Sequence, residues 1–355
     1  MIKKQKAVSA IQWARCLALT VGVVLLISSL GCSRDRQATI SLQGAGATFP
    51  YPLYSKWMSE YQRLKPNVRI DYQSIGSGAG IRQIRERVVD FGASDAPMTD
   101  QDLNAAPGKI LHIPTVIGAV VVTYNLPSVN GELKLERATL AGIFLGEITK
   151  WNDAKLRAIN STLALPDTAI VVVHRTDGSG TTNIFTDFLS RSSPLWQQRA
   201  GKGTSVNWPV GIGGKGNEGV TGQVKQLPGA IGYVELAYAE QNKLPYALIE
   251  NPAGEFIKPS IGSTTAAAAG IISAMPEDFR VSLVNAPGRG AYPIAGFTYI
   301  LIYQNQAHTA KGRALVEFLQ WAIREGQEYA SAILYAPLPI ELVPRVYNKL
   351  RTITY

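Results

Sequence analysis

The feature that most constrains the fold of this chain is a strand, a glycine-rich turn and a helix in succession, a unit that occurs three times. A predicted strand at 39–42 leads into GAGATFPYP, one at 68–72 into IGSGAG, and one at 169–175 into TDGSG. After each turn, apolar residues recur at spacings of three and four, which is typical of a buried helix face. Strands that alternate with helices build a mainly parallel sheet, and ligand crevices lie at the C-terminal ends of its strands.

The first two units are adjacent and the third comes much later, so we expect two lobes. Two further apolar stretches, 116–125 and 295–303, are expected to cross between them, and a helix at 312–333 to close the first lobe. The predicted domains are a first lobe of 39–123 and 295–355 and a second lobe of 124–294. The predicted inward-facing helix residues are Tyr54, Trp57, Tyr61 and Leu64; Ile81, Ile84 and Val88; Ile184, Phe185, Phe188 and Leu189; and Leu315, Phe318, Leu319, Ala322 and Ile323.

The N-terminus has the layout of an export signal. Four of the first 15 residues are basic, residues 16–31 carry no charge, and the apolar stretch is too short for an ordinary membrane span. We therefore predict a signal peptide at 1–31 and a polar tether at 32–38, and removal of the signal lowers the net charge from +9 to +5. The string LGCS resembles a bacterial lipoprotein cleavage site, at which Cys32 would be lipidated. The alternative is an ordinary signal cut nearby, which leaves Cys32 a free thiol.

Composition excludes several classes of protein. Apolar residues make up 46% of the 355, enough for a sizeable core, whereas charged residues make up 17% and form no basic run beyond the N-terminus, which argues against nucleic-acid binding. The only cysteines are Cys16 and Cys32, so the folded body has no disulfide and no cysteine metal site. The histidines lack metal-ligand spacing, and neither a P-loop nor a Gly-x-Ser-x-Gly nucleophile motif is present.

The glycine-rich turns are candidate anion sites. Glycine lets backbone N–H groups converge, and a helix N-terminus adds about half a positive charge. The alternative is that they are tight turns capped by Ser77 or Ser179. The charged candidates are Asp95 in DFGASDAP and Arg175 with Asp177 in HRTDGSGTT. The alternative roles are a helix cap for Asp95, a solvated strand end for Arg175 and a turn residue for Asp177. Spacing alone does not decide between these roles and ligand binding.

Six strings carry a resemblance to a known family: GAGATFPYPLYSKW, DYQSIGSGAGIRQI, VDFGASDAP, HRTDGSGTTNIFTDFL, WPVGIGGKGNEGVTGQV and LPGAIGYVELAYA. Together they resemble the substrate-binding proteins of bacterial phosphate ABC transporters. The resemblance implies a two-lobed α/β periplasmic-binding-protein fold, each lobe a mainly parallel sheet flanked by helices, with the ligand in the cleft. It also implies contacts to phosphate from Thr48, Phe49, Ser77 and Asp95 of the first lobe and from Arg175, Ser179, Gly180 and Thr181 of the second, with Asp177 pairing to Arg175.

These residue types suit a protonated oxyanion. Hydroxyls, N–H groups and a bidentate guanidinium donate to its oxygens, whereas Asp95 needs a proton from the ligand, which phosphate has and sulfate lacks. We therefore expect a high-affinity extracytoplasmic phosphate receptor that delivers phosphate to the membrane permease subunits of an ABC transporter. We expect it to be a monomer anchored in a membrane by lipid on Cys32, without enzymatic activity, cofactor, metal or nucleic-acid partner. The alternatives are a phosphatase-like enzyme, a structural or adhesion lipoprotein, and a binding protein for sulfate or another oxyanion.

Overall fold

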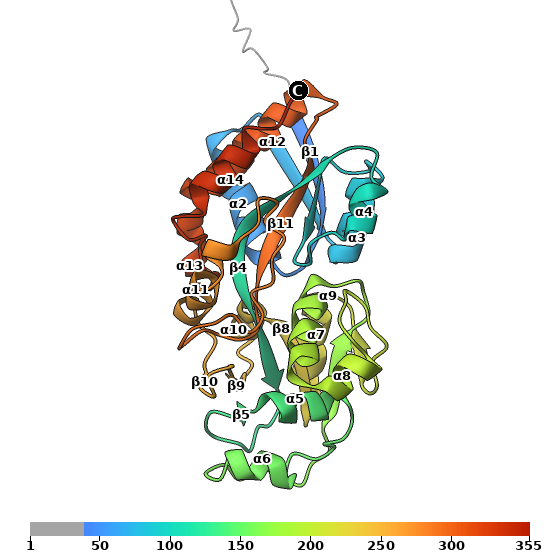
Figure 1. Cartoon of the computed structure of the whole chain (residues 1–355), viewed down its shortest axis with the longest axis vertical. Helices are drawn as coiled ribbons and strands as arrows, with labels where there is room; N and C mark the ends of the chain where they lie inside the picture. Colours follow the sequence, from blue (N-terminus) through green and yellow to red (C-terminus); the bar gives the residue numbers. More distant parts are fainter. Residues whose placement is uncertain (1–38) are drawn as a thin grey trace, which may run out of the picture. The chain divides into compact units, whose positions relative to one another are not determined.

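The computed structural model describes residues 39–355, and Figure 1 shows the arrangement of their helices and strands. The strands are β1 (Ile40–Gly46), β2 (Val68–Ser74), β3 (Phe91–Ser94), β4 (Ile110–Tyr124), β5 (Lys134–Leu135), β6 (Val171–Arg175), β7 (Ile212–Gly214), β8 (Ala230–Glu235), β9 (Leu248–Glu250), β10 (Phe256–Ile257) and β11 (Ala295–Tyr303). The α-helices are α2 (Tyr51–Leu64), α3 (Ser77–Arg85), α4 (Asp100–Asn104), α5 (Arg137–Phe144), α6 (Ala154–Ile159), α7 (Gly180–Ser192), α8 (Pro194–Arg199), α9 (Gly216–Gln226), α10 (Leu236–Gln241), α11 (Ile261–Ala269), α12 (Thr309–Ala322), α13 (Glu328–Ala332) and α14 (Val343–Leu350). Two short 3-10 helices are η1 (Ile272–Ala274) and η2 (Glu325–Gln327).

One sheet of eight strands runs through the molecule in the order β2-β1-β3-β11-β4-β8-β6-β7, and β10-β9-β5 form a small second sheet. The strands at each end of the large sheet are parallel, β1 with β2 and β3, and β6 with β7 and β8. The strands between them, β11 and β4, are antiparallel to their neighbours. The two-lobed α/β fold expected from the sequence is confirmed, with the qualification that one continuous sheet is shared.

Strand β4 belongs to both halves of the sheet. Its 15 residues are all buried, and it pairs with β11 as far as Ala119 and with β8 from Val120 onward. In Figure 1, β4 runs from the half that holds α2, α3 and α12 into the half that holds α5, α7 and α8. Because both faces of this strand are buried, its sequence is mostly apolar rather than alternating, and the run from Val116 to Val122 is unbroken.

Several predicted elements agree with the structure, and some of their details do not. The stretch predicted at 295–303 is β11, and the predicted face of the helix after TDGSG is buried in α7. The predicted faces of the first two helices were wrong at their last positions, since Leu64 is 61% and Val88 62% exposed. Leu64 is the last residue of α2, and Val88 lies beyond the end of α3 at Arg85. The helical spacing on which both predictions rested therefore ends before it can place these side chains in the core.

The single helix predicted at 312–333 is broken. Its inward-facing residues in α12 are buried as expected, but the helix ends at Ala322 and is followed by η2 and α13. The Gln327 side chain donates to the carbonyls of Ala322 and Thr115 at 2.9 and 3.0 Å, and Trp57 Nε1 donates to Gly326 O at 2.6 Å. The carbonyls of Ala322 and Gly326, which a continuous helix would pair within itself, are thereby satisfied by side chains, and the bond to Thr115 ties this segment to β4.

The predicted signal peptide, the tether and Cys32 lie outside the described residues. From residue 39 to residue 355, the helices are all too short or too polar to span a membrane.

Candidate functional site

Two of the predicted glycine-rich turns touch each other at the N-termini of α3 and α7. Gly78 N donates to Gly178 O at 2.9 Å, and Gly180 N donates to Ser77 Oγ at 3.0 Å. A Cβ on Gly78 would lie 3.2 Å from the Cα of Gly178, and a Cβ on Gly180 would lie 2.6 Å from Ser77 Oγ. Glycine is therefore needed here for close approach of the two turns, because side chains would hold them apart.

The third turn, which carries Thr48 and Phe49, is held by tyrosines. The hydroxyls of Tyr72, Tyr238 and Tyr335 donate to the carbonyls of three consecutive residues, Ala47, Thr48 and Phe49, at 2.7, 2.6 and 2.6 Å. Within 39–355, the N–H groups of Thr48 and Phe49 have no hydrogen-bond acceptor. With its carbonyls fixed, this buried turn has N–H groups left to offer to an anion.

Arg175 at the end of β6 forms a buried ion pair with Asp177. Its Nε and Nη2 donate to the two carboxylate oxygens at 2.8 and 2.5 Å, and the arginine side chain is 1% exposed. Gly216 N also donates to Asp177, at 3.0 Å. Burial alone would raise the pKa of Asp177, but its hydrogen bonds and the charge of Arg175 hold the pKa below the usual value. The pair therefore orients the guanidinium and offsets its charge, and the alternative of a solvated strand end for Arg175 is wrong.

Asp95 follows β3 and is 4% exposed. Thr298 Oγ1 donates to its Oδ1 at 2.8 Å, and Ser77 Oγ lies 3.4 Å from its Oδ2. Burial raises the pKa of Asp95 to about 7, although the hydrogen bonds from Thr298 and Ser77 and the charge of Arg175 oppose the rise. At neutral pH this carboxyl is therefore poised between its charged and neutral forms. It does not cap a helix, because the N-cap of the next helix is Thr99.

The two serines differ in their local roles. Ser179 caps α7, as its Oγ accepts from Thr182 N at 3.0 Å, and among the residues that the structure describes its own hydroxyl proton has no acceptor. Ser77 is the first residue of α3 rather than its cap. Its Oγ accepts from Gly180 N and from Asp95 N, so Ser77, Asp95 and Gly180 form one buried cluster.

The remaining predicted residues meet through Asn217, which the sequence did not single out. Asn217 is fully buried at the start of α9, and its side-chain Nδ2 donates to Thr48 Oγ1 at 2.7 Å and to Thr181 Oγ1 at 3.3 Å. Thr181 Oγ1 also accepts from Arg175 Nη1 at 3.4 Å. The structure thus brings the predicted residues into one buried region. Two residues that the sequence did not predict, Asn217 and Thr298, also contact this region. The only sequence signal for Asn217 was its place in the string GKGNEG, which is part of the family resemblance.

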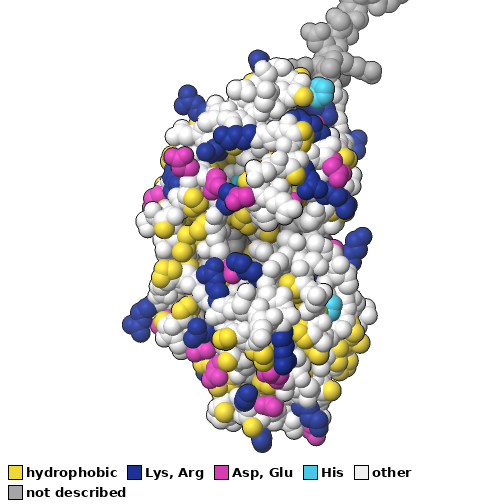
Figure 2. Space-filling model, turned by 45° about the vertical axis from the view of Figure 1, so that its right-hand side comes forward, with side chains coloured by type: hydrophobic (Ala, Val, Ile, Leu, Met, Phe, Trp, Pro, Cys, Tyr) yellow, Lys and Arg dark blue, Asp and Glu magenta, His cyan; other side chains and the backbone are white. Residues whose placement is uncertain are grey.

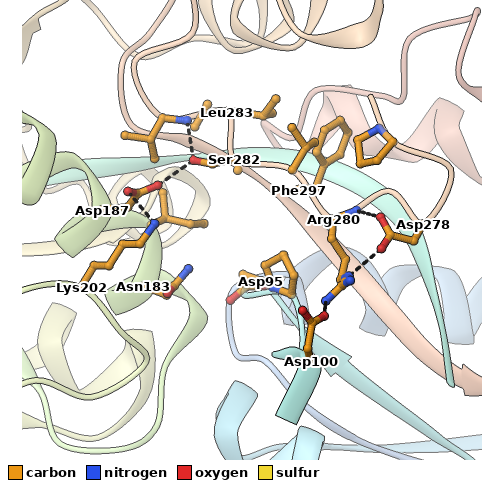
Figure 3. Close-up of a pocket in the computed structure, with 17 residues that line it drawn as sticks. Asp95, Asp100, Asn183, Asp187, Lys202, Asp278, Arg280, Ser282, Leu283 and Phe297 are labelled. Carbon is orange, nitrogen blue, oxygen red and sulfur yellow. Dashed lines mark hydrogen bonds and ion pairs between the residues drawn. The ribbon is translucent and has the colours of Figure 1, made fainter. Parts of the chain in front are cut away.

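A cavity of about 490 Å³ lies beside Asp95 (Figure 3). On one side of it, Arg280 pairs with Asp278 and Asp100, both at 2.7 Å. On the other side, Asp187 pairs with Lys202 at 3.2 Å and accepts from Ser282 Oγ at 2.7 Å. The charges around the cavity are therefore largely paired. On the face of the molecule that Figure 2 shows, acidic and basic side chains are interspersed, without a continuous basic stripe.

Comparison with known proteins gives the family. A model described as a PBP superfamily domain matches residues 33–325. The "Phosphate-binding protein PstS" of Xylella fastidiosa is 45% identical over 315 residues, 88% of this chain and 86% of the relative, and that of Haemophilus influenzae is 44% identical over 92% and 97%. A solved phosphate-binding protein from Stenotrophomonas maltophilia has the same fold, with a TM-score of 0.67 at 20% identity over 87% of this chain and 94% of that one. The chain therefore belongs to the PBP superfamily and, within it, to the family of the phosphate-binding protein PstS.

Proposed function

We propose that this protein binds inorganic phosphate outside the cytoplasm and delivers it to the permease of an ABC transporter for import. The observation that carries the proposal is the combination of many buried donors with one buried carboxyl, Asp95, in a site where two turns meet. The residues proposed to contact phosphate are Thr48, Phe49, Ser77, Asp95, Arg175, Ser179, Gly180 and Thr181, with Asp177 behind Arg175.

The donors suit a tetrahedral oxyanion. Arg175 is oriented and neutralised by Asp177, so the anion is held by one guanidinium edge, hydroxyls and the N–H groups of the Thr48–Phe49 turn. Hydrogen bonds from N–H and O–H groups to an anion are stronger than those between neutral groups, and burial increases their strength. Sequestration in such a site needs no large excess of positive charge.

Asp95 provides the discrimination. A phosphate ion carries at least one proton near neutral pH, and this proton is shared with the Asp95 carboxyl in a short hydrogen bond. Sulfate carries no proton, so an ionised Asp95 would face a sulfate oxygen unpaired. The pKa of Asp95, about 7, is close to the pKa of the phosphate ion with which this carboxyl shares the proton.

The protein acts without catalysis in this proposal. A phosphatase-like enzyme on this scaffold needs a nucleophile with a base, or a metal. Within the described residues no group of three or more His, Cys, Asp or Glu is placed to hold a metal ion. His174 stacks on Trp208 with ring centroids 4.9 Å apart, and His112 Nε2 accepts from Met98 N at 2.9 Å, so both have structural partners.

The remaining features of the proposal concern the lobes and the membrane. The lobes are 39–123 with 295–355, and 124–294, supported by β4, which changes its partner from β11 to β8 after Ala119. The mature chain is a monomer that starts at Cys32 and is tethered to a membrane by lipid on that residue. Mass spectrometry of the exported protein tests the lipid, because an unmodified Cys32 contradicts it.

Isothermal titration calorimetry with phosphate and sulfate in parallel tests the function. We expect one phosphate per chain and no measurable heat with sulfate at pH 8. A turnover assay with a phosphomonoester runs alongside and is expected to give none. Equal binding of both anions, binding of neither, or catalytic turnover would each overturn the proposal.

A further inference from the structure

Asn217 is a fully buried polar side chain that joins the Thr48 turn to the N-terminus of α7. It is the second residue of α9, and the N-cap of that helix is Lys215, so Asn217 does not cap its own helix. Its Oδ1 accepts from Glu235 N of β8 at 2.9 Å. A backbone N–H can only donate, so the oxygen of the amide must face β8 and the NH₂ group must face the two threonines.

This orientation determines what the threonine hydroxyls can do. Thr48 Oγ1 accepts from both Asn217 Nδ2 and Asn217 N, at 2.7 and 3.3 Å. Thr181 Oγ1 accepts from Asn217 Nδ2 and from Arg175 Nη1, at 3.3 and 3.4 Å. A hydroxyl has two lone pairs and one proton, so both acceptor sites of each oxygen are filled. Across 39–355, neither hydroxyl donates its own proton to a protein acceptor.

We propose that Asn217 is a positioning residue that makes the Thr48 and Thr181 hydroxyls obligate donors and thereby determines which oxygens of the ligand must be unprotonated. The inference rests on the proposed binding of phosphate. A ligand oxygen that faces these hydroxyls must be an acceptor, because a protonated oxygen would meet two donors that cannot accept. The phosphate proton is consequently excluded from this side of the site and is directed to Asp95, the group that can accept it.

The substitution Asn217→Asp tests this, since it keeps the shape and the Oδ1 contact but replaces the NH₂ by an acceptor. The carboxylate would then take the protons of both threonines and remove two donors from the ligand. We expect phosphate affinity to fall about 100-fold or more. The matched control is Asn130→Asp, which adds the same charge at an exposed loop position and should leave the affinity unchanged.

A double-mutant cycle separates this role from simple charge repulsion or loss of structure. In a Thr48→Val background one of the two hydroxyls is already absent, so Asn217→Asp should cost at least about tenfold less there than in the wild type. If the loss is the same in both backgrounds, Asn217 does not act through Thr48, and the inference is overturned. Failure of the wild-type protein to bind phosphate would instead overturn the proposed function, and circular dichroism of each variant confirms that it is folded.

Discussion

Replacement of Asp95 by asparagine tests the proposed basis of selectivity most directly. The variant keeps an oxygen for the bond from Thr298 Oγ1, which is 2.8 Å long in the wild type, so the fold should be retained. The amide places NH₂ where the second carboxylate oxygen lies, beside Ser77. A carboxyl group that can only accept when it is ionised is thereby replaced by an amide that donates towards the ligand at every pH.

The magnitude follows from the hydrogen bonds involved. Phosphate loses a bond to a charged acceptor, worth about 1.5 to 3 kcal/mol, which is about 10- to 100-fold in affinity. Sulfate gains a donor that does not depend on pH, so its affinity should rise about 100-fold at pH 9, where the neutral form of Asp95 is rare. The wild-type preference for phosphate, expected to be about 10⁴ to 10⁵ for a site built around a ligand hydroxyl, should therefore fall by about 10³ to 10⁴ at pH 9.

Calorimetry with both anions between pH 6 and pH 9 measures the effect. Only the neutral form of Asp95 can donate to sulfate, and the pKa of this carboxyl is about 7. Sulfate affinity of the wild type should therefore level off below pH 7 and fall about tenfold per pH unit above it. The Asp95→Asn variant should show no such slope. The exposed Asp100 gives the matched control, since Asp100→Asn removes the same charge near the cavity and should leave the preference intact. An unchanged preference in Asp95→Asn would refute the reasoning.

Three further outcomes are expected. Arg175→Ala should weaken phosphate binding in calorimetry by at least about 100-fold, because a charged bidentate donor is lost, and retained affinity would exclude it from the site. Gly78→Ala should lower phosphate affinity and enlarge the radius of gyration in small-angle scattering with phosphate present, because the new methyl group would meet Gly178; an unchanged radius would contradict the close contact. In the ligand-free protein, the raised pKa of Asp95 stabilises the fold below pH 4, and this contribution, at most about 4 kcal/mol, is lost as the pH rises to 7. Urea unfolding should show a decline that Asp95→Asn lacks.

Local patterns were sufficient to predict the main strands and helices. β11 coincides with the predicted stretch, and α7 buries the predicted face, since both depend on side-chain periodicity within one element. The break after α12 could not be predicted in this way. It depends on the contacts of Gln327 with Thr115 and of Trp57 with Gly326, which join residues more than 200 positions apart in the sequence.

The same limit applies to the candidate site. Glycine-rich turns and charged residues with unusual neighbours marked Ser77, Asp95 and Arg175, and the resemblance to a family assigned their roles. Asn217 and Thr298 have no such local signal. Asn217 contacts Thr48, 169 positions away, and Thr298 contacts Asp95, 203 positions away, so their roles follow only from the folded sheet.

The ion pair of Arg175 with Asp177 has a consequence for where such a receptor can work. The guanidinium already carries its own counter-ion inside the protein, and the other proposed donors are neutral dipoles enclosed away from water. Dissolved salt screens exposed charges over about 10 Å at 0.1 M but acts much less on buried groups. Capture of the nutrient should thus change little between fresh water and brine, and a cell would keep its supply when the salinity of its surroundings shifts.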